Sequence, residues 1–164
     1  PLERLIAGLN WLEQVSMRGR FLPFREGFAV IDDTYNSNPR ALMQMIDVLA
    51  GVPAFERRIL VVGEMLELGR DSGALHYECG AYAAGRRLDF VIGVRGAARE
   101  IVRGALDAGI PESGARFFPD SDTAGEFVRS LVREGDLLLV KGSRGVRTER
   151  IVQTLRTYFQ ILRS

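Results

Sequence analysis

The sequence has only one cysteine and one histidine among its 164 residues. One cysteine cannot form a disulfide bond within the chain, which argues against a small secreted scaffold held together by disulfides. One histidine and one cysteine cannot supply the four ligands of the usual structural zinc site. We therefore expect this chain to hold no metal centre of its own.

A strong net charge is also missing, because 22 Lys and Arg residues face 21 Asp and Glu residues, which leaves a formal charge of +1. Non-specific nucleic-acid binding needs a broad positive field, so we expect no nucleic-acid partner. No apolar run approaches the length of about 18 residues that indicates a transmembrane helix. No charged stretch followed by an apolar one opens the chain, so no signal peptide is visible. We expect no membrane insertion and a cytoplasmic location.

Short apolar runs alternate with segments of helical periodicity along the chain. The helical pattern is clearest at Leu42, Met45, Ile46 and Leu49, whose spacing places them on one helix face. A last helix is expected to carry Ile151, Leu155, Tyr158, Phe159 and Leu162 on its apolar face. The apolar runs at 28–31, 59–62, 90–92, 116–118 and 137–140 are predicted to be strands.

Strands that are continuously apolar and separated by helices predict an α/β fold. We expect a Rossmann-like, mostly parallel sheet of five to six strands with helices on both faces. Residues 20–24 contain Pro23 and precede the turn sequence 25–27, which predicts an N-terminal edge hairpin arm. Residues 2–12 have the pattern of a short amphipathic helix.

Two helix starts and one core residue are also predicted. Asn38 is expected to cap a helix that has Pro39 at its first position. Ser72 is the expected cap of the helix that carries His76 and Cys79. We interpret His76 as a packed or capping residue rather than a catalytic base, and Cys79 as part of the core.

Polar residues gather after the predicted strands, where open α/β sheets bind their ligands. The densest segment, 32–38, holds two carboxylates, a phenol, two amides and two hydroxyls. A carboxylate at a strand end suits the hydroxyl groups of a ribose. Turn formation and helix capping would explain Asn38 and Ser37 without a ligand. They do not explain Asp32, Asp33, Tyr35 and Asn36 together, and the full string is Asp32-Asp33-Thr34-Tyr35-Asn36-Ser37-Asn38-Pro39.

A second polar segment follows the last predicted strand and joins a lysine, a serine and an arginine between glycines. It reads Lys141-Gly142-Ser143-Arg144-Gly145 and precedes a helix, a setting that favours contact with a phosphate or a carboxylate. A glycine turn with solvated charges remains the alternative. The order of residues is not that of a Walker A loop, and no Gly-x-Gly-x-x-Gly fingerprint follows the first strand of the sheet, so a separate NAD enzyme is not expected.

These motifs, in this order, resemble the C-terminal domain of the Mur ligase family. The resemblance rests on 31–39, on 62–69 (Val-Gly-Glu-Met-Leu-Glu-Leu-Gly) with His76, and on 140–144, and it covers about residues 5–155. Arg18-Gly19-Arg20 resembles the Gly-Arg element that opens this domain in the family. Two departures are Glu64, where the family often has Asp, and Ser37, where Ala is common.

The resemblance implies a ligase of peptidoglycan synthesis. ATP, with Mg²⁺ held mainly by a central domain, would phosphorylate the carboxylate of UDP-N-acetylmuramoyl tripeptide, and the amine of D-alanyl-D-alanine would attack the acyl phosphate. By the same resemblance, Arg20 and Lys141 would be catalytic. The ATP contacts would come from Arg20, Asp33, Tyr35, Asn36 and Asn38, and the substrate contacts from Asn36, Lys141, Ser143 and Arg144.

The chain begins with Pro1 and has no Walker A loop. We therefore expect residues 1–164 to form a single domain, with 1–17 as a linking helix and lead-in. Its partners would be its own N-terminal and central ATPase domains, and the fragment alone would be inactive. Three alternatives remain open: a nucleotide- or partner-binding α/β module without catalysis, a domain like that of folylpolyglutamate synthase, which usually has His-Asn-Pro in the first loop, and a complete small α/β enzyme.

Overall fold

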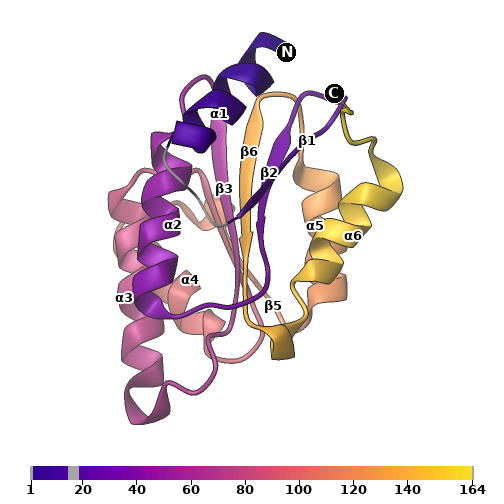
Figure 1. Ribbon diagram of the computed structural model, residues 1–164. Coiled ribbons are helices and arrows are strands. Elements are labelled where there is room, and N and C mark those ends of the chain that lie inside the picture. Colours follow the sequence, from indigo (N-terminus) through magenta and orange to yellow (C-terminus); the bar gives the residue numbers. More distant parts are fainter. Residues whose placement is uncertain (1, 15–18, 164) are drawn as a thin grey trace.

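The described part of the chain forms one six-stranded sheet in the order β1-β2-β6-β3-β4-β5. The structure is a computed structural model and describes residues 2–14 and 19–163 (Figure 1). Only β1 is antiparallel to its neighbour, and the other pairs are parallel. The strands are β1 (Arg20–Pro23), β2 (Ala29–Asp33), β3 (Arg57–Gly63), β4 (Phe90–Val94), β5 (Ala115–Phe118) and β6 (Asp136–Lys141). This arrangement confirms the predicted mostly parallel sheet and its edge hairpin.

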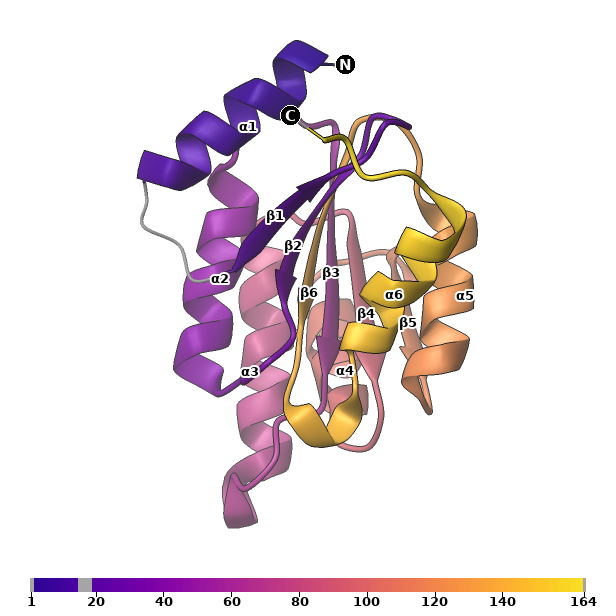
Figure 2. The same ribbon diagram turned by 45° about the vertical axis from the view of Figure 1, so that its right-hand side comes forward.

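Helices cover both faces of the sheet (Figures 1 and 2). The α-helices are α1 (Leu2–Gln14), α2 (Pro39–Gly51), α3 (Ser72–Gly85), α4 (Ala98–Asp107), α5 (Ser121–Leu131) and α6 (Glu149–Tyr158). Three short 3₁₀ turns are η1 (Gly69–Asp71), η2 (Glu112–Gly114) and η3 (Arg144–Val146). None of the described helices is long and apolar enough to cross a membrane.

The two faces of the sheet belong to two separate apolar clusters. Ile31, Leu60 and Leu139 pack on the side of α2, α3 and α4. Their chain neighbours Val30 and Val61 pack with α5 and α6 on the other side. Because successive strand residues point to opposite faces, both sets must be apolar, and this explains the unbroken apolar runs in the sequence.

The two predicted helix starts have different outcomes. Asn38 caps α2 as expected, because its Oδ1 accepts the N–H of Ala41 at 2.9 Å and Pro39 is the first helical residue. Ser72 was predicted as the cap of α3, and this is wrong. The turn η1 runs directly into the helix, so Asp71 takes the cap position, without a side-chain capping bond, and Ser72 becomes the first helical residue.

The last helix is shorter than its apolar pattern predicts. It ends at Tyr158, Phe159 is extended, and Leu162 lies beyond the helix. The Leu162 N–H donates to Pro23 O at 2.8 Å, and the Arg25 N–H donates to Gln160 O at 2.8 Å. Backbone pairing with the free edge of the hairpin has replaced the helix here, because the edge offers hydrogen-bond partners that the periodicity of the sequence does not reveal.

The only cysteine supplies a test of the packing between α3 and the sheet. Cys79 is completely buried, as the sequence predicted, and burial, with a smaller contribution from Glu78, raises its pKa to about 12. The thiolate is the reactive form, so the native thiol should resist a disulfide reagent in mildly alkaline buffer and react fully in concentrated guanidinium chloride. The absorbance of the chromophore that the reagent releases measures how much thiol has reacted. Rapid reaction of the native protein would contradict the described core.

Candidate functional site

The sheet has a topological switch point at β6. This strand lies between β2 and β3, and the chain leaves it toward α6, whereas it leaves β2 and β3 toward α2 and α3 on the opposite face (Figures 1 and 2). The loops that follow these strands therefore diverge at the carboxyl end of the sheet. Such a switch point is where open α/β sheets bind their ligands. Both polar segments singled out in the sequence lie here.

A buried ion pair joins the two segments. Asp33 and Lys141 are register partners at the ends of β2 and β6. Lys141 Nζ lies 2.7 Å from Asp33 Oδ2 and donates a second bond to Asn36 O at 2.9 Å. The two side chains are only 4% and 16% exposed. A charge so far removed from water requires its partner, so each residue holds the other loop in place.

An exposed aromatic ring and two exposed guanidinium groups lie at the same edge of the sheet. Tyr35 is 68% exposed, and the Arg144 guanidinium lies over its ring at 4.6 Å from the centroid. Arg20 approaches Asp32 Oδ2 at 3.5 Å while remaining 63% exposed. Both arginines can therefore meet an anion from solvent, and the free face of Tyr35 offers a flat apolar surface.

The remaining predicted site residues take part in local structure. Asn36 Oδ1 accepts the N–H of Ser37 at 2.8 Å, and Asn38 Oδ1 caps α2. Ser143 is largely buried at the start of η3. The structure thus brings all the predicted residues to one edge of the sheet, where Asp33, Lys141 and Asn38 are engaged within the protein and Arg20, Tyr35 and Arg144 are exposed. Arg18 of the Gly-Arg element lies outside the described residues.

His76 supports the neighbouring loop after β3. It is completely buried, its Nε2 accepts the N–H of Met65 at 2.9 Å, and its Nδ1 lies 2.6 Å from Ser72 O. These two bonds select the tautomer that carries its proton on Nδ1. The interpretation of His76 as a packed residue is confirmed.

Two residues outside the predicted set connect further loops to this edge. Arg95 donates to Gly145 O at 2.7 Å and lies 3.8 Å from Glu64 Oε2. Glu64 Oε1 also accepts the N–H of Ala97 at 3.2 Å. The loops after β3, β4 and β6 are thereby joined. Arg95 has a positive φ of 70° next to a glycine. Its position just after a predicted strand is the sequence signal that could have placed it in this set.

Ser37, one of the two departures noted in the sequence, has a buried side chain in the loop before α2. Its hydroxyl is buried and has no hydrogen-bond partner among the described residues. Alanine would fill the same place without leaving a polar group unpaired, so Ser37→Ala should not lower stability through a lost hydrogen bond.

Comparison with known families identifies the class of domain. A family model described as Mur ligase, glutamate ligase domain, matches residues 17–144, and the chain belongs to this family. The relatives it resembles include UDP-N-acetylmuramoyl-tripeptide–D-alanyl-D-alanine ligase from Bacillus subtilis, 32% identical over 150 residues, and from Escherichia coli, 33% identical over 159 residues. These matches cover 90% and 94% of this chain but 32% and 33% of the relatives, so the chain spans about a third of their length.

Solved structures confirm the fold. A crystal structure of MurF from Acinetobacter baumannii matches with a TM-score of 0.74 and 27% identity, over 85% of this chain and 30% of that one. The MurF ligase from Thermotoga maritima, in complex with ADP, matches with a TM-score of 0.68 and 26% identity, over 91% of this chain and 36% of that one.

The ion pair should contribute strongly to stability. Replacing Lys141 with methionine keeps the length of the side chain but leaves the Asp33 carboxylate buried without a cation. We expect Lys141→Met to lower the free energy of unfolding by about 2–4 kcal/mol, measured by urea denaturation.

Arg103→Met is the matched control, because it removes an exposed ion pair with Glu100 on the surface of α4. This control should change stability by less than about 1 kcal/mol. Equal losses in the two variants would contradict the structural role of the buried pair.

Proposed function

We propose that the chain is the C-terminal domain of an ATP-dependent ligase that joins D-alanyl-D-alanine to UDP-N-acetylmuramoyl tripeptide in peptidoglycan synthesis. The observation that carries the proposal is the edge described above, where Arg20, Tyr35 and Arg144 are exposed at the same end of the strands as the buried Lys141–Asp33 pair. The curated relatives of this family member bear the name of that ligase.

The proposal includes a division of work between domains. Residues 1–164 are taken as a single domain whose linking and lead-in segment, 1–17, contains α1, although residues 1 and 15–17 lie outside the described part of the chain. The N-terminal and central domains of the ligase are assigned to other parts of the protein. The central domain holds the ATP phosphates and most of the Mg²⁺ coordination. Because the reaction consumes ATP and a nucleotide-linked sugar peptide, we place it in the cytoplasm.

The nucleotide contacts are assigned from the polar atoms and ring faces that are not already engaged within the protein. Tyr35 and Arg20 are exposed, so they can reach the nucleotide and its phosphates. Asp33 uses Oδ2 for Lys141, and its Oδ1 is assigned to a ribose hydroxyl. Asn36 and Asn38 lie in the same loop and are assigned to the nucleotide as well.

The substrate contacts come from the loop after β6. Arg144 and Ser143 face the dipeptide or the acyl phosphate, together with Asn36. Lys141 donates two of its three N–H groups within the domain, which leaves one for a phosphoryl oxygen.

The proposed reaction has two steps, and negative charge shifts among the reacting groups in each of them, so nearby cations can assist both. The substrate carboxylate takes the terminal phosphoryl group of ATP and ADP leaves, after which the amine forms the amide bond and phosphate leaves. Fixed cations stabilise charge that develops on the phosphoryl oxygens. Arg20 is exposed beside Asp32 and Lys141 is held by Asp33, so both are placed before the substrates arrive.

The isolated chain should fold but should release no phosphate from ATP, even with the tripeptide and D-alanyl-D-alanine present. The product of the complete gene should release phosphate and form the amide in equal amounts. Coupled phosphate detection and mass spectrometry measure the two products. The upstream gene sequence should also encode Gly-x-x-x-x-Gly-Lys-Ser/Thr, and a gene without it would contradict the proposal.

Arg20→Ala in the complete enzyme should act mainly on kcat, because the proposed contact strengthens as charge develops on the phosphoryl group. We expect kcat to fall about 10- to 100-fold, with a smaller change in KM for ATP. Steady-state kinetics measure both constants. Arg129→Ala, which removes an exposed pair with Glu126 on α5, is the control and should leave both unchanged. A pure rise in KM would assign Arg20 to ground-state binding only.

A further inference from the structure

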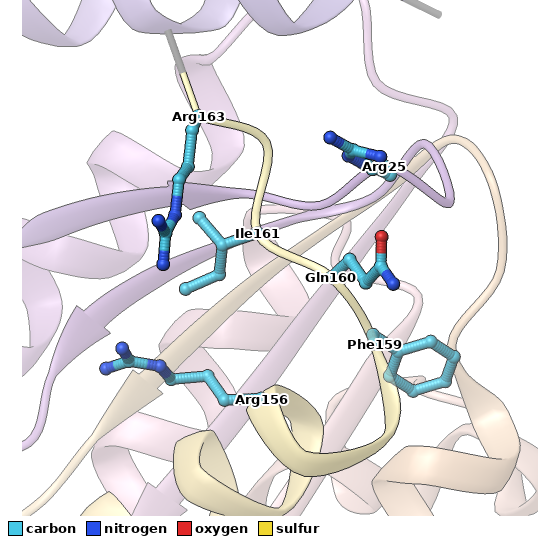
Figure 3. Close-up of a pocket in the computed structure, with 6 residues that line it drawn as sticks. All are labelled: Arg25, Arg156, Phe159, Gln160, Ile161 and Arg163. Carbon is cyan, nitrogen blue, oxygen red and sulfur yellow. The ribbon is translucent and has the colours of Figure 1, made fainter.

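A hollow lined by arginines lies at the opposite end of the sheet from the proposed ligase site. Its volume is about 450 Å³. Figure 3 shows its lining, which comes from the turn of the β1–β2 hairpin and from the chain at and after the end of α6. The lining residues are Arg25, Arg156, Phe159, Gln160, Ile161 and Arg163.

The backbone on both sides of the hollow is fixed. Residue Ile161 forms a β-bridge with Phe24, and the Arg25 N–H donates to Gln160 O at 2.8 Å. The Gln160 N–H in turn lies 3.3 Å from both carboxylate oxygens of Glu26. The segment after α6 is therefore tied to the hairpin, and the arginines project from a defined frame. The carboxylate of Glu26, the acidic residue of the hairpin turn, accepts from the backbone N–H of Gln160.

The three arginines have no acidic partner in the chain as described. Across residues 2–14 and 19–163, no ion pair or side-chain hydrogen bond engages the guanidinium of Arg25, Arg156 or Arg163. Elsewhere in the same chain, arginines such as Arg57 and Arg150 are paired with carboxylates. In a protein with a net charge of only +1, this is a local concentration of positive charge.

We propose that the hollow binds a compact anion of the phosphate class with more than one negative charge, such as a diphosphate group. Guanidinium groups present paired N–H donors that match phosphate oxygens, and several of them around one hollow favour a multiply charged ligand over chloride. The volume is in the range of small-molecule sites, and Phe159 and Ile161 add an apolar wall for an organic substituent. None of the residues that line the hollow belongs to the proposed ligase site, so the two sites are distinct.

Inorganic pyrophosphate is the probe, titrated at low ionic strength into the isotope-labelled chain and followed by NMR. We expect saturable binding, with shifts of the amide signals of Arg25 and Gln160 and of the Arg156 side chain. The double variant Arg156→Gln/Arg163→Gln should weaken binding about tenfold or more at these signals. Arg103→Gln, an exposed charge on α4, should leave it unchanged. Arg144→Gln, at the proposed ligase site, should also leave it unchanged, which separates this test from that of the ligase function.

Equal affinity of the wild type and the double variant for pyrophosphate would show that binding does not depend on Arg156 and Arg163. This result would overturn the proposal. Shifts confined to residues 141–147 would assign pyrophosphate to the ligase site and would overturn it as well. Sedimentation with vesicles that contain anionic phospholipid tests a third outcome, in which the arginines bind a membrane surface. Binding to these vesicles without binding of pyrophosphate would point to a membrane surface and contradict a small-anion site. An unchanged thermal unfolding midpoint confirms that the double variant is folded.

Discussion

The Lys141–Asp33 ion pair is the constraint on which the candidate functional edge depends. It joins the ends of two neighbouring parallel strands at the switch point, where the chain turns toward opposite faces of the sheet. Lys141 also holds Asn36 O, so one ammonium group orders the loop that carries Tyr35. Arg144 lies over that ring from the other loop. The exposed groups can therefore keep their relative positions because a buried pair beneath them fixes both loops.

The sequence predicted the architecture well because each strand and helix has a strong local signal. The apolar runs and the Asn38-Pro39 start were sufficient for the sheet and for α2. The errors arose where non-local pairing decides the structure. The end of α6 depends on hydrogen bonds to the hairpin, and the start of α3 depends on the preceding turn η1.

The candidate site was predicted as a set of residues but not as a network. The sequence predicted Asp33 and Lys141 in ligand-binding loops, whereas their pairing requires two residues 108 positions apart in the chain to meet at the ends of neighbouring strands. The contacts of Arg95 with Gly145 and Glu64 were invisible for the same reason. The near-zero net charge conceals an uneven distribution in the structure, because Arg20 and Arg144 are exposed at one end of the sheet and three further arginines line the hollow at the other end.

Hydrogen exchange tests the central claim most directly, because it reports how often each loop opens. The amides to follow are Gly142, bonded to Asp33 O at 3.3 Å, and Ser37, with Val61 in β3 as the reference for global unfolding. If the ion pair orders both loops, Lys141→Met should raise exchange at Gly142 and Ser37 together, beyond the change at Val61. Exchange at the two loop amides that changes only as much as at Val61 would contradict the account.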